Sequence, residues 1–353
     1  MLEPGTLLEE SIAQARALGA SDLHITVESP PCVRVDGALR RLEMDPLPPA
    51  AVEALVRTVM KPERGRELEA RGSANFAFGS AGEGRYRAHV FRQRGALALA
   101  VRLIPPEPPA LETLELPEIV AELAMRPHGL VLVAGPAGSG KSTTLAGMVD
   151  RINRMRSCHV VTLEDPVEYL HRHRMSIVHQ REIGDDAPSF AEGLAAALRQ
   201  DPDVLLIAEL RDPETIAAAL AAAETGHLVL ASVRARGAAS AVERIVDAFP
   251  PHRQNRARLQ LADTLQGVVA QALLPRPEGG RTAVAEVLVG IPKVRDLIRA
   301  GKERQLSSLM QAGARFGMQT MAGALDRAVE EGRVRRADAE NLKEAWPALA
   351  GRR

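Results

Sequence analysis

The chain has 353 residues, of which 46% are hydrophobic and 25% charged; this is typical of a soluble globular protein of about two domains. The 45 Lys and Arg residues balance 45 Asp and Glu residues, and aromatic residues make up only 3%, which argues against a generally basic, aromatic surface for nucleic acids. The two cysteines, Cys32 and Cys158, exclude a disulfide scaffold and a four-thiolate zinc site.

The sequence shows no signal for export or membrane insertion. The N-terminal residues Met1-Leu-Glu-Pro-Gly lack the basic and apolar regions of a signal peptide. No apolar stretch approaches the ~18 residues that a membrane-spanning helix needs. We therefore expect a cytosolic protein.

The first part of the chain alternates short helical and strand-like patterns. Apolar residues recur at helical spacing over residues 6–18 and 50–60. Apolar and polar residues alternate over 23–27 and 33–35, as in half-buried strands. We expect a small α+β domain over residues 1–104.

A further strand of this domain begins at Arg85. Tyr86, Ala88 and Val90 would share one of its faces. Arg85 and Arg87 would share the other, because side chains alternate across a strand.

A proline-rich segment separates this domain from the rest. Residues 104–110 read Ile-Pro-Pro-Glu-Pro-Pro-Ala, in which neither a helix nor a central strand is expected. We predict a linker over 105–118, a sheet wrapped by helices over 119–292 and a helical subdomain over 293–353. The chain as a whole is predicted to be an α/β protein.

The region after the linker carries clear strand and helix signals. Ser189 and Glu192 form a capping box that opens a helix. Asp212 and Pro213 supply the cap and first residue of an Ala-rich helix that Gly226 ends. Short apolar runs that predict buried strands occupy residues 130–134, 159–163, 204–208 and 228–231.

The strongest chemical signal is a phosphate-binding loop between a predicted strand and helix. Glycines let backbone N–H groups surround the phosphates, while the helix N-terminus adds partial positive charge. Lys141 would reach the β- and γ-phosphate oxygens, and Ser142 would place its hydroxyl on Mg²⁺. The alternative is a chance glycine-rich turn, but the context of strand and helix favours ATP binding. The predicted nucleotide-binding residues are Gly135, Pro136, Ala137, Gly138, Ser139, Gly140, Lys141, Ser142 and Thr143.

Acidic residues follow two of the predicted strands. Glu209 follows the run 204–208, and Glu164 and Asp165 follow the run 159–163. Ligands of α/β sheets bind at the carboxyl ends of strands, and hydrolysis needs a group that activates water. The alternative for any one of these acids is a solvated or helix-capping role.

These residues resemble the hexameric secretion ATPases of type II secretion and type IV pili, most closely the pilus retraction (PilT-like) ATPases. The resemblance covers almost the whole chain. The motifs that carry it are residues 20–25 (ASDLHI), 31–37 (PCVRVDG), 162–168 (TLEDPVE, similar to the Asp box), 201–212 (DPDVLLIAELRD, similar to Walker B), 223–229 (AETGHLV, similar to the His box) and 294–302 (VRDLIRAGK).

The resemblance implies a fold and an assembly. It implies a RecA-like P-loop ATPase domain, a PAS-like N-terminal domain and a homohexamer. It also implies an inner-membrane platform protein as partner; no nucleic acid is expected, because of the balanced charge and the few aromatic residues. The chain would act in the cytoplasm at the inner face of the cell membrane, held there only through its partner.

The resemblance also assigns roles to single residues. Glu209 would polarise the attacking water, and Glu164 would lie near the metal and γ-phosphate. His227 matches the first histidine of the His box; its alternative is a hydrogen-bonded histidine before a strand. Arginines of the N-terminal domain would approach the nucleotide, or else solubilise strand faces. These arginines are Arg85, Arg87, Arg94 and Arg102.

One motif departs from the family pattern. The His box usually continues with a second histidine, in Thr-Leu-His-Thr, whereas this chain reads Ser232-Val-Arg234-Ala. A histidine can accept or donate a proton, while arginine only donates and stays charged. Two interpretations of Arg234 stay open: it stabilises the γ-phosphate, or it marks altered or slow turnover.

The leading hypothesis is a hexameric motor ATPase that retracts type IV pili by disassembling them into pilin. The alternative is a weakly catalytic, nucleotide-binding accessory subunit of a pilus or secretion motor. A DNA translocase is a distant third, because zero net charge and few aromatic residues leave little to hold DNA.

Overall fold

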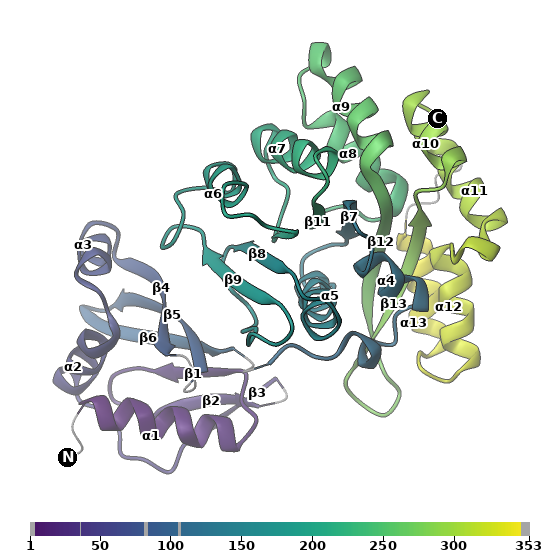
Figure 1. The fold of residues 1–353 in the computed structure, drawn as a ribbon. Helices are drawn as coiled ribbons and strands as arrows, with labels where there is room; N and C mark the ends of the chain where they lie inside the picture. Colours follow the sequence, from purple (N-terminus) through teal and green to yellow (C-terminus); the bar gives the residue numbers. More distant parts are fainter. Residues whose placement is uncertain (1–3, 36, 81–83, 105–106, 347–353) are drawn as a thin grey trace. The chain divides into compact units, whose positions relative to one another are not determined.

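The computed structural model describes residues 4–35, 37–80, 84–104 and 107–346. These residues form two compact units (Figure 1). The first contains the described residues before Glu107 together with Glu168–Leu170, and the second contains the others. The predicted domains include residues 1–3, 105–106 and 347–353, and the motif 31–37 includes residue 36. These positions lie outside the described residues.

The first unit is built on a six-stranded antiparallel sheet in the order β3-β2-β1-β6-β5-β4. Its strands are β1 (Asp22–Ile25), β2 (Cys32–Val35), β3 (Ala38–Arg41), β4 (Ser73–Ser80), β5 (Gly84–Gln93) and β6 (Ala96–Leu103). Its helices are α1 (Pro4–Ala17), α2 (Pro49–Val59) and α3 (Pro62–Arg71). Leu23, Val33, Leu55 and Val101 are completely buried in the core of this unit.

The side chains of β5 alternate as predicted. Tyr86, Ala88 and Val90 are buried, while Arg87 is exposed and Arg85 is partly exposed. The period of two follows from the pleat of the strand, which sends successive side chains to opposite faces. The apolar face therefore meets the core, and the arginines lie on the other face.

The second unit contains a seven-stranded sheet in the order β13-β12-β7-β11-β10-β8-β9. The six strands from β12 to β9 are parallel, and only β13 runs antiparallel, beside β12. The strands are β7 (Gly129–Ala134), β8 (His159–Glu164), β9 (Ile177–Glu182), β10 (Val204–Ile207), β11 (Leu228–Val233), β12 (Leu265–Pro275) and β13 (Arg281–Val289). The residues of β7, β10 and β11 are all buried, as expected for parallel strands covered on both faces.

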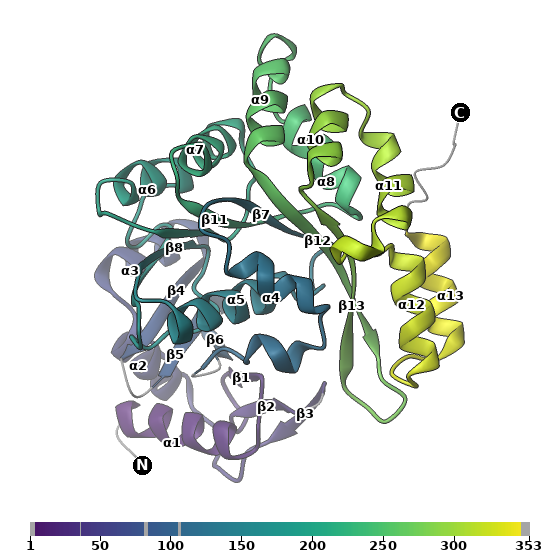
Figure 2. The same ribbon diagram turned by 45° about the vertical axis from the view of Figure 1, so that its right-hand side comes forward.

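Helices cover both faces of this sheet (Figures 1 and 2). The helices of the second unit are α4 (Glu118–Ala124), α5 (Lys141–Met155), α6 (Phe190–Ala197), α7 (Pro213–Glu224), α8 (Ala238–Asp247), α9 (Pro251–Thr264), α10 (Pro292–Arg299), α11 (Leu306–Ala312), α12 (Met321–Glu330) and α13 (Arg336–Ala345). Leu145, Met148, Val149 and Ile152 of α5 recur at helical spacing and are at most 2% exposed. This stripe packs α5 against β7 and β11.

Both predicted helix caps are confirmed. The Ser189 hydroxyl accepts a hydrogen bond from the Glu192 backbone N–H at 3.2 Å and opens α6. The Asp212 carboxylate accepts one from the Thr215 N–H at 2.7 Å, and Pro213 is the first residue of α7. These bonds satisfy N–H groups that have no partner inside the helix.

The sequence signals did not identify β9 or the long β12–β13 hairpin. Glu286 of β13 ties this hairpin to two helices, because its carboxylate accepts backbone N–H bonds from Ala238 at the start of α8 and Met321 at the start of α12. Burial raises the pKa of Glu286, while these two bonds oppose the rise. Figure 2 shows α12 and α13 beside β13, within the second unit. None of the helices in the described part of the chain has the length and apolar character needed to cross a bilayer.

Candidate nucleotide-binding and catalytic site

A glycine-rich loop joins β7 to α5, both labelled in Figure 1. Gly138 and Gly140 have φ angles of 76° and 88°, a left-handed conformation that glycine adopts without strain. Gly140 is also the cap residue of α5, so the cap itself places no side chain over the helix N-terminus. Such an end attracts phosphate through its backbone N–H groups and its partial positive charge.

The side chain of Lys141 folds back over this loop. Its ammonium group donates to the carbonyl oxygens of Gly135 at 3.0 Å and Pro136 at 2.8 Å. An ammonium group has three donors and a flexible stem, so it can exchange such partners for phosphate oxygens. Lys141 therefore lies at the loop, and its contact with phosphate stays a prediction.

The other candidate residues lie at the carboxyl ends of four neighbouring parallel strands, at the same end of the sheet as the loop (the phosphate edge). In sheet order, Gly135 follows β7, Arg234 follows β11, Glu209 lies just beyond β10, and Glu164 ends β8. The Gly135 N–H donates to Val233 of β11 at 3.3 Å, which fixes the loop against the next strand. Residues separated by almost 100 positions in sequence thus share one edge, where open α/β sheets bind ligands.

Glu209 is the centre of a charged cluster. Its carboxylate pairs with Arg234, whose Nε lies 2.5 Å from Oε1, and with Arg211, whose Nε lies 2.7 Å from Oε2. Arg211 also reaches Asp165, with 3.2 Å between Nη1 and Oδ2. The hydrogen bond to Glu209 raises the pKa of the Arg211 guanidinium. The Glu209 side chain is 12% exposed, whereas those of Arg211 and Arg234 are 47% and 57% exposed.

Two neutral donors contact Glu164. Its Oε1 accepts hydrogen bonds from the Thr162 hydroxyl at 2.6 Å and the Gln180 amide at 3.0 Å. These bonds come from its own strand and from β9. They fix the carboxylate at the carboxyl end of β8. The neighbouring strand in the sheet is β10, which Glu209 follows in the chain.

His227 lies at the amino ends of the strands, opposite the end that carries the phosphate loop. It precedes β11, and its carbonyl accepts a hydrogen bond from Gly129, the first residue of β7. Its Nδ1 lies 3.0 Å from the Ala222 carbonyl and 3.2 Å from the Thr225 hydroxyl, at the end of α7. The six residues of β11 separate it from the phosphate edge. The catalytic role that the resemblance implies for His227 stays a prediction.

The predicted nucleotide-binding arginines of the first unit lie on or beside β5 and β6. Arg85 and Arg87 belong to β5, Arg94 occupies the turn after it, and Arg102 belongs to β6. Arg102 pairs with Asp22 of β1, with 3.0 Å between Nε and Oδ1. Arg87, Arg94 and Arg102 are exposed. Their approach to nucleotide stays a prediction.

The donor set suits magnesium better than a softer metal. Ser142 lies in the first turn of α5, and the nearby strand ends carry carboxylates. Mg²⁺ takes oxygen ligands and usually keeps water and substrate phosphates in its shell, with one or two ligands from the protein. No group of three or more His, Cys, Asp or Glu side chains that could hold a metal occurs among the described residues. The Ser142 hydroxyl and one carboxylate would be sufficient for Mg²⁺ beside a triphosphate.

Two residues of the site were not singled out from the sequence. Arg211 stands two positions after Glu209, so its pairing with that carboxylate was within reach of local reasoning. Gln271 lies beneath the phosphate loop and is 1% exposed. Its signal was a single amide inside the apolar run of residues 267–274.

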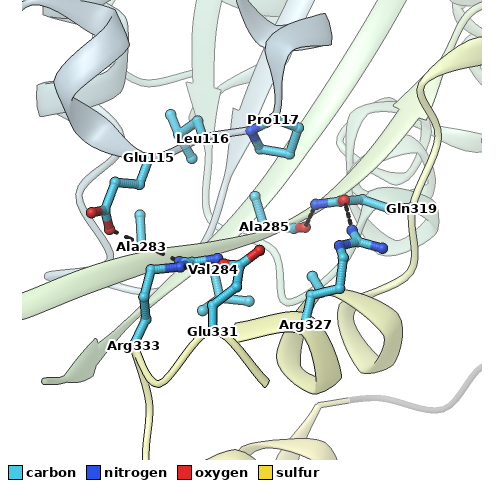
Figure 3. Close-up of a pocket in the computed structure, with 11 residues that line it drawn as sticks. Glu115, Leu116, Pro117, Ala283, Val284, Ala285, Gln319, Arg327, Glu331 and Arg333 are labelled. Atoms are coloured by element: carbon cyan, nitrogen blue, oxygen red, sulfur yellow. Dashed lines mark hydrogen bonds and ion pairs between the residues drawn. The ribbon is translucent and has the colours of Figure 1, made fainter. Parts of the chain in front are cut away.

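A separate cavity of about 400 Å³ lies between residues 115–117, β13 and the region of α12 (Figure 3). Glu115 accepts hydrogen bonds from Arg276 and from the Thr282 hydroxyl, and Arg333 lies 3.9 Å away. The hydrogen bond from Arg276 lowers the pKa of Glu115. None of the residues predicted to bind nucleotide lines this cavity.

The similarity to known proteins extends over nearly the whole chain. Residues 5–278 match the family described as type II/IV secretion system protein. The chain is 40% identical to the type IV pilus retraction ATPase PilT of Pseudomonas aeruginosa, over 96% of this chain and 97% of PilT. It is 42% identical to the type IV pilus ATPase PilU of the same organism, over 91% of this chain and 84% of PilU. A crystal structure of the pilus retraction motor PilT with bound ADP matches with a TM-score of 0.88 at 45% identity, covering 95% of this chain and 96% of that one.

Proposed function

Because the chain belongs to the type II/IV secretion system protein family and is a PilT-like ATPase, we propose that it is the motor that retracts a type IV pilus. The observation that carries this proposal is that the phosphate loop and Glu209 lie at the carboxyl ends of strands of one parallel sheet. Similarity to PilT over 96% of the chain adds the biological process, because it includes both units.

The residues of this edge divide the work of hydrolysis. The loop N–H groups and Lys141 hold the phosphates, and Glu209 orients and activates the attacking water. Ser142 and a strand-end carboxylate would hold Mg²⁺, which neutralises phosphate charge when it is bound. Arg234 and Arg211 lie on Glu209 and supply the cations that can move to the phosphate as its charge develops.

The proposal includes the assembly. The second unit would be a RecA-like ATPase domain and the first a PAS-like domain that moves with the nucleotide state. Six copies would form a ring through head-to-tail interfaces, which give rings when the rotation between copies closes. The ring would work in the cytoplasm at the inner face of the membrane, docked to a platform protein of the pilus. ATP hydrolysis would then drive the disassembly of the pilus into pilin.

Two experiments test this function. The first measures phosphate release from Mg²⁺-ATP together with the mass of the oligomer, and we expect hydrolysis by a hexamer. No release above background at any oligomeric state contradicts the ATPase. The second expresses the chain in Pseudomonas aeruginosa lacking PilT, where restored twitching supports retraction. A Lys141→Ala chain is the control, since it lacks the cation of the phosphate loop.

A second candidate function is favoured by the pairing of Arg234 with Glu209. A permanent cation 2.5 Å from the catalytic carboxylate can hold it away from water, as in a weakly catalytic accessory subunit. Arg234→His separates the two functions. A large gain in turnover supports the accessory subunit, whereas a loss shows that Arg234 is part of an adapted motor site.

A further inference from the structure

Gln271 is an amide side chain buried at the centre of the phosphate-loop support. It lies on β12, and its neighbours Ala270 and Ala272 are 0% and 7% exposed. Its Nε2 donates to the carbonyl oxygen of Ser139 at 2.7 Å, and its Oε1 accepts from the Thr144 hydroxyl at 2.9 Å. A buried amide is costly unless it is hydrogen-bonded, and here both ends of the amide are used.

The two partners of Gln271 flank the residues that contact phosphate. Ser139 belongs to the loop, Thr144 lies in the first turn of α5, and Gly140 and Lys141 stand between them. One side chain therefore joins the loop to the helix that follows it. Ser139 and Thr144 are 3% and 2% exposed, so water does not compete for these bonds.

The backbone of the loop also lies directly against this strand position. A Cβ atom at Gly140 would lie 3.0 Å from the side-chain Nε2 of Gln271. A Cβ atom at Gly135 would lie 2.7 Å from the backbone carbonyl oxygen of Gln271. The distance at Gly135 is shorter than real Cβ contacts, and the distance at Gly140 is so tight that the Gln271 amide would have to shift. These glycines therefore admit β12 as a close support, as well as providing the backbone conformation of the loop.

The geometry of a peptide bond gives this support a chemical consequence. In a planar trans peptide the carbonyl oxygen and the N–H point in opposite directions. The Ser139 carbonyl is held toward β12 by Gln271, so the N–H of Gly140 in the same peptide points away from β12. Backbone N–H groups of this loop are the groups that bind phosphate.

We infer that Gln271 is a positioning residue for ATP binding: its amide fixes the peptide between Ser139 and Gly140 and thereby aims a phosphate-binding N–H. The inference rests on the proposed ATPase site and deepens it. An apolar side chain of similar size would fill the space, but would leave the Ser139 carbonyl and the Thr144 hydroxyl without these partners.

Gln271→Glu tests the inference, because the substitution can be reversed by pH. A carboxylate still accepts from Thr144 but cannot donate to the Ser139 carbonyl, whereas a protonated carboxyl group can do both. Because burial raises the pKa of such a carboxyl group, we expect affinity for a fluorescent ATP analogue to fall about tenfold at pH 9 and to recover toward the wild-type value near pH 5. Gln319→Glu is the matched control, since Gln319 also donates to a carbonyl, that of Ala285 at 2.6 Å, but outside the site.

Each outcome decides the inference. Affinity of Gln271→Glu within twofold of wild type at pH 9, or a loss that persists near pH 5, overturns it. If thermal melting shows that this variant is unfolded, Thr144→Val decides instead: we expect about threefold weaker binding, and unchanged binding overturns the inference. If the wild-type protein itself binds no nucleotide, the proposed function is contradicted. If the wild type binds nucleotide and only the variants depart from expectation, the inference alone is contradicted.

Discussion

The phosphate loop and the Glu209 cluster share one sheet edge but are held in different ways. The loop rests on buried neutral hydrogen bonds, in which Ser139 and Gln271 are at most 3% exposed. Glu209 is held by charged partners, Arg211 and Arg234, whose side chains are about half exposed. Rearranging the loop would break buried bonds, whereas exposed ion pairs exchange partners at little cost because water screens them.

This difference separates binding from turnover. A loop that keeps its shape without ligand favours binding, because less conformational entropy is lost when ATP arrives. A carboxylate that shares its arginines can release them to a developing phosphate charge. Substitutions in the loop should therefore change affinity, and substitutions in the cluster should change the rate.

The largest effect is expected for Lys141→Ala. This substitution removes the cation at the loop, and we expect ATP affinity to fall by on the order of 100-fold and hydrolysis to become undetectable. Calorimetric titration with ATP measures the affinity. Lys343→Ala is the control: Lys343 also donates to two partners, Asp326 and Glu340, but outside the site. Equal losses in the two variants would contradict the role of Lys141.

Glu209→Gln should affect only the chemical step. The amide keeps the size of the side chain but cannot activate water, so we expect turnover to fall at least ~100-fold while ATP affinity stays within a few-fold of wild type. Phosphate release and nucleotide titration check both parts. Glu115→Gln is the matched control, since Glu115 also lies beside two arginines, Arg276 and Arg333, but outside the site. A comparable loss of affinity in Glu209→Gln would remove the distinction between the two regions.

Arg211→Gln should have a smaller effect on the rate. It removes the link between Glu209 and Asp165 while leaving Arg234 in place, and we expect turnover to fall about fivefold with unchanged affinity for ADP. Arg299→Gln is the control, because Arg299 also joins two aspartates, Asp263 and Asp296. Turnover of Arg211→Gln equal to that of the control would show that the cluster does not need this cation.

The smallest effect gives the value of a carboxylate–arginine contact outside the site. The pKa of Glu115 is lowered from 4.5, so its contribution to stability is present above pH 4.5 and lost as the pH falls below that value. Because the group is partly exposed, we expect Glu115→Gln to lower the free energy of unfolding by less than about 1 kcal/mol at pH 7. Denaturant unfolding at pH 7 and pH 3 measures this. A difference in the free energy of unfolding between variant and wild type that is larger at pH 3 than at pH 7 would contradict this prediction.

The sequence determined the features that depend on near neighbours. The phosphate loop, the caps at Ser189 and Asp212 and the alternation around Tyr86 each need only a few adjacent residues, whose conformational preferences are local. The position of Glu209 after a buried strand could also be predicted from the sequence. The role of His227 stays a prediction: the residue precedes its strand and donates or accepts hydrogen bonds at the end of α7, as in the alternative interpretation of the sequence.

Only the tertiary structure decided which distant residues meet. Gln271 supports Ser139 across 132 positions of sequence, and Arg234 reaches Glu209 across 25. Strand order and register make these contacts, and neither is encoded in a local pattern, because the sheet pairs strands according to the packing of the whole core. The chemistry of single residues was therefore visible in the chain, while their partners depended on the fold.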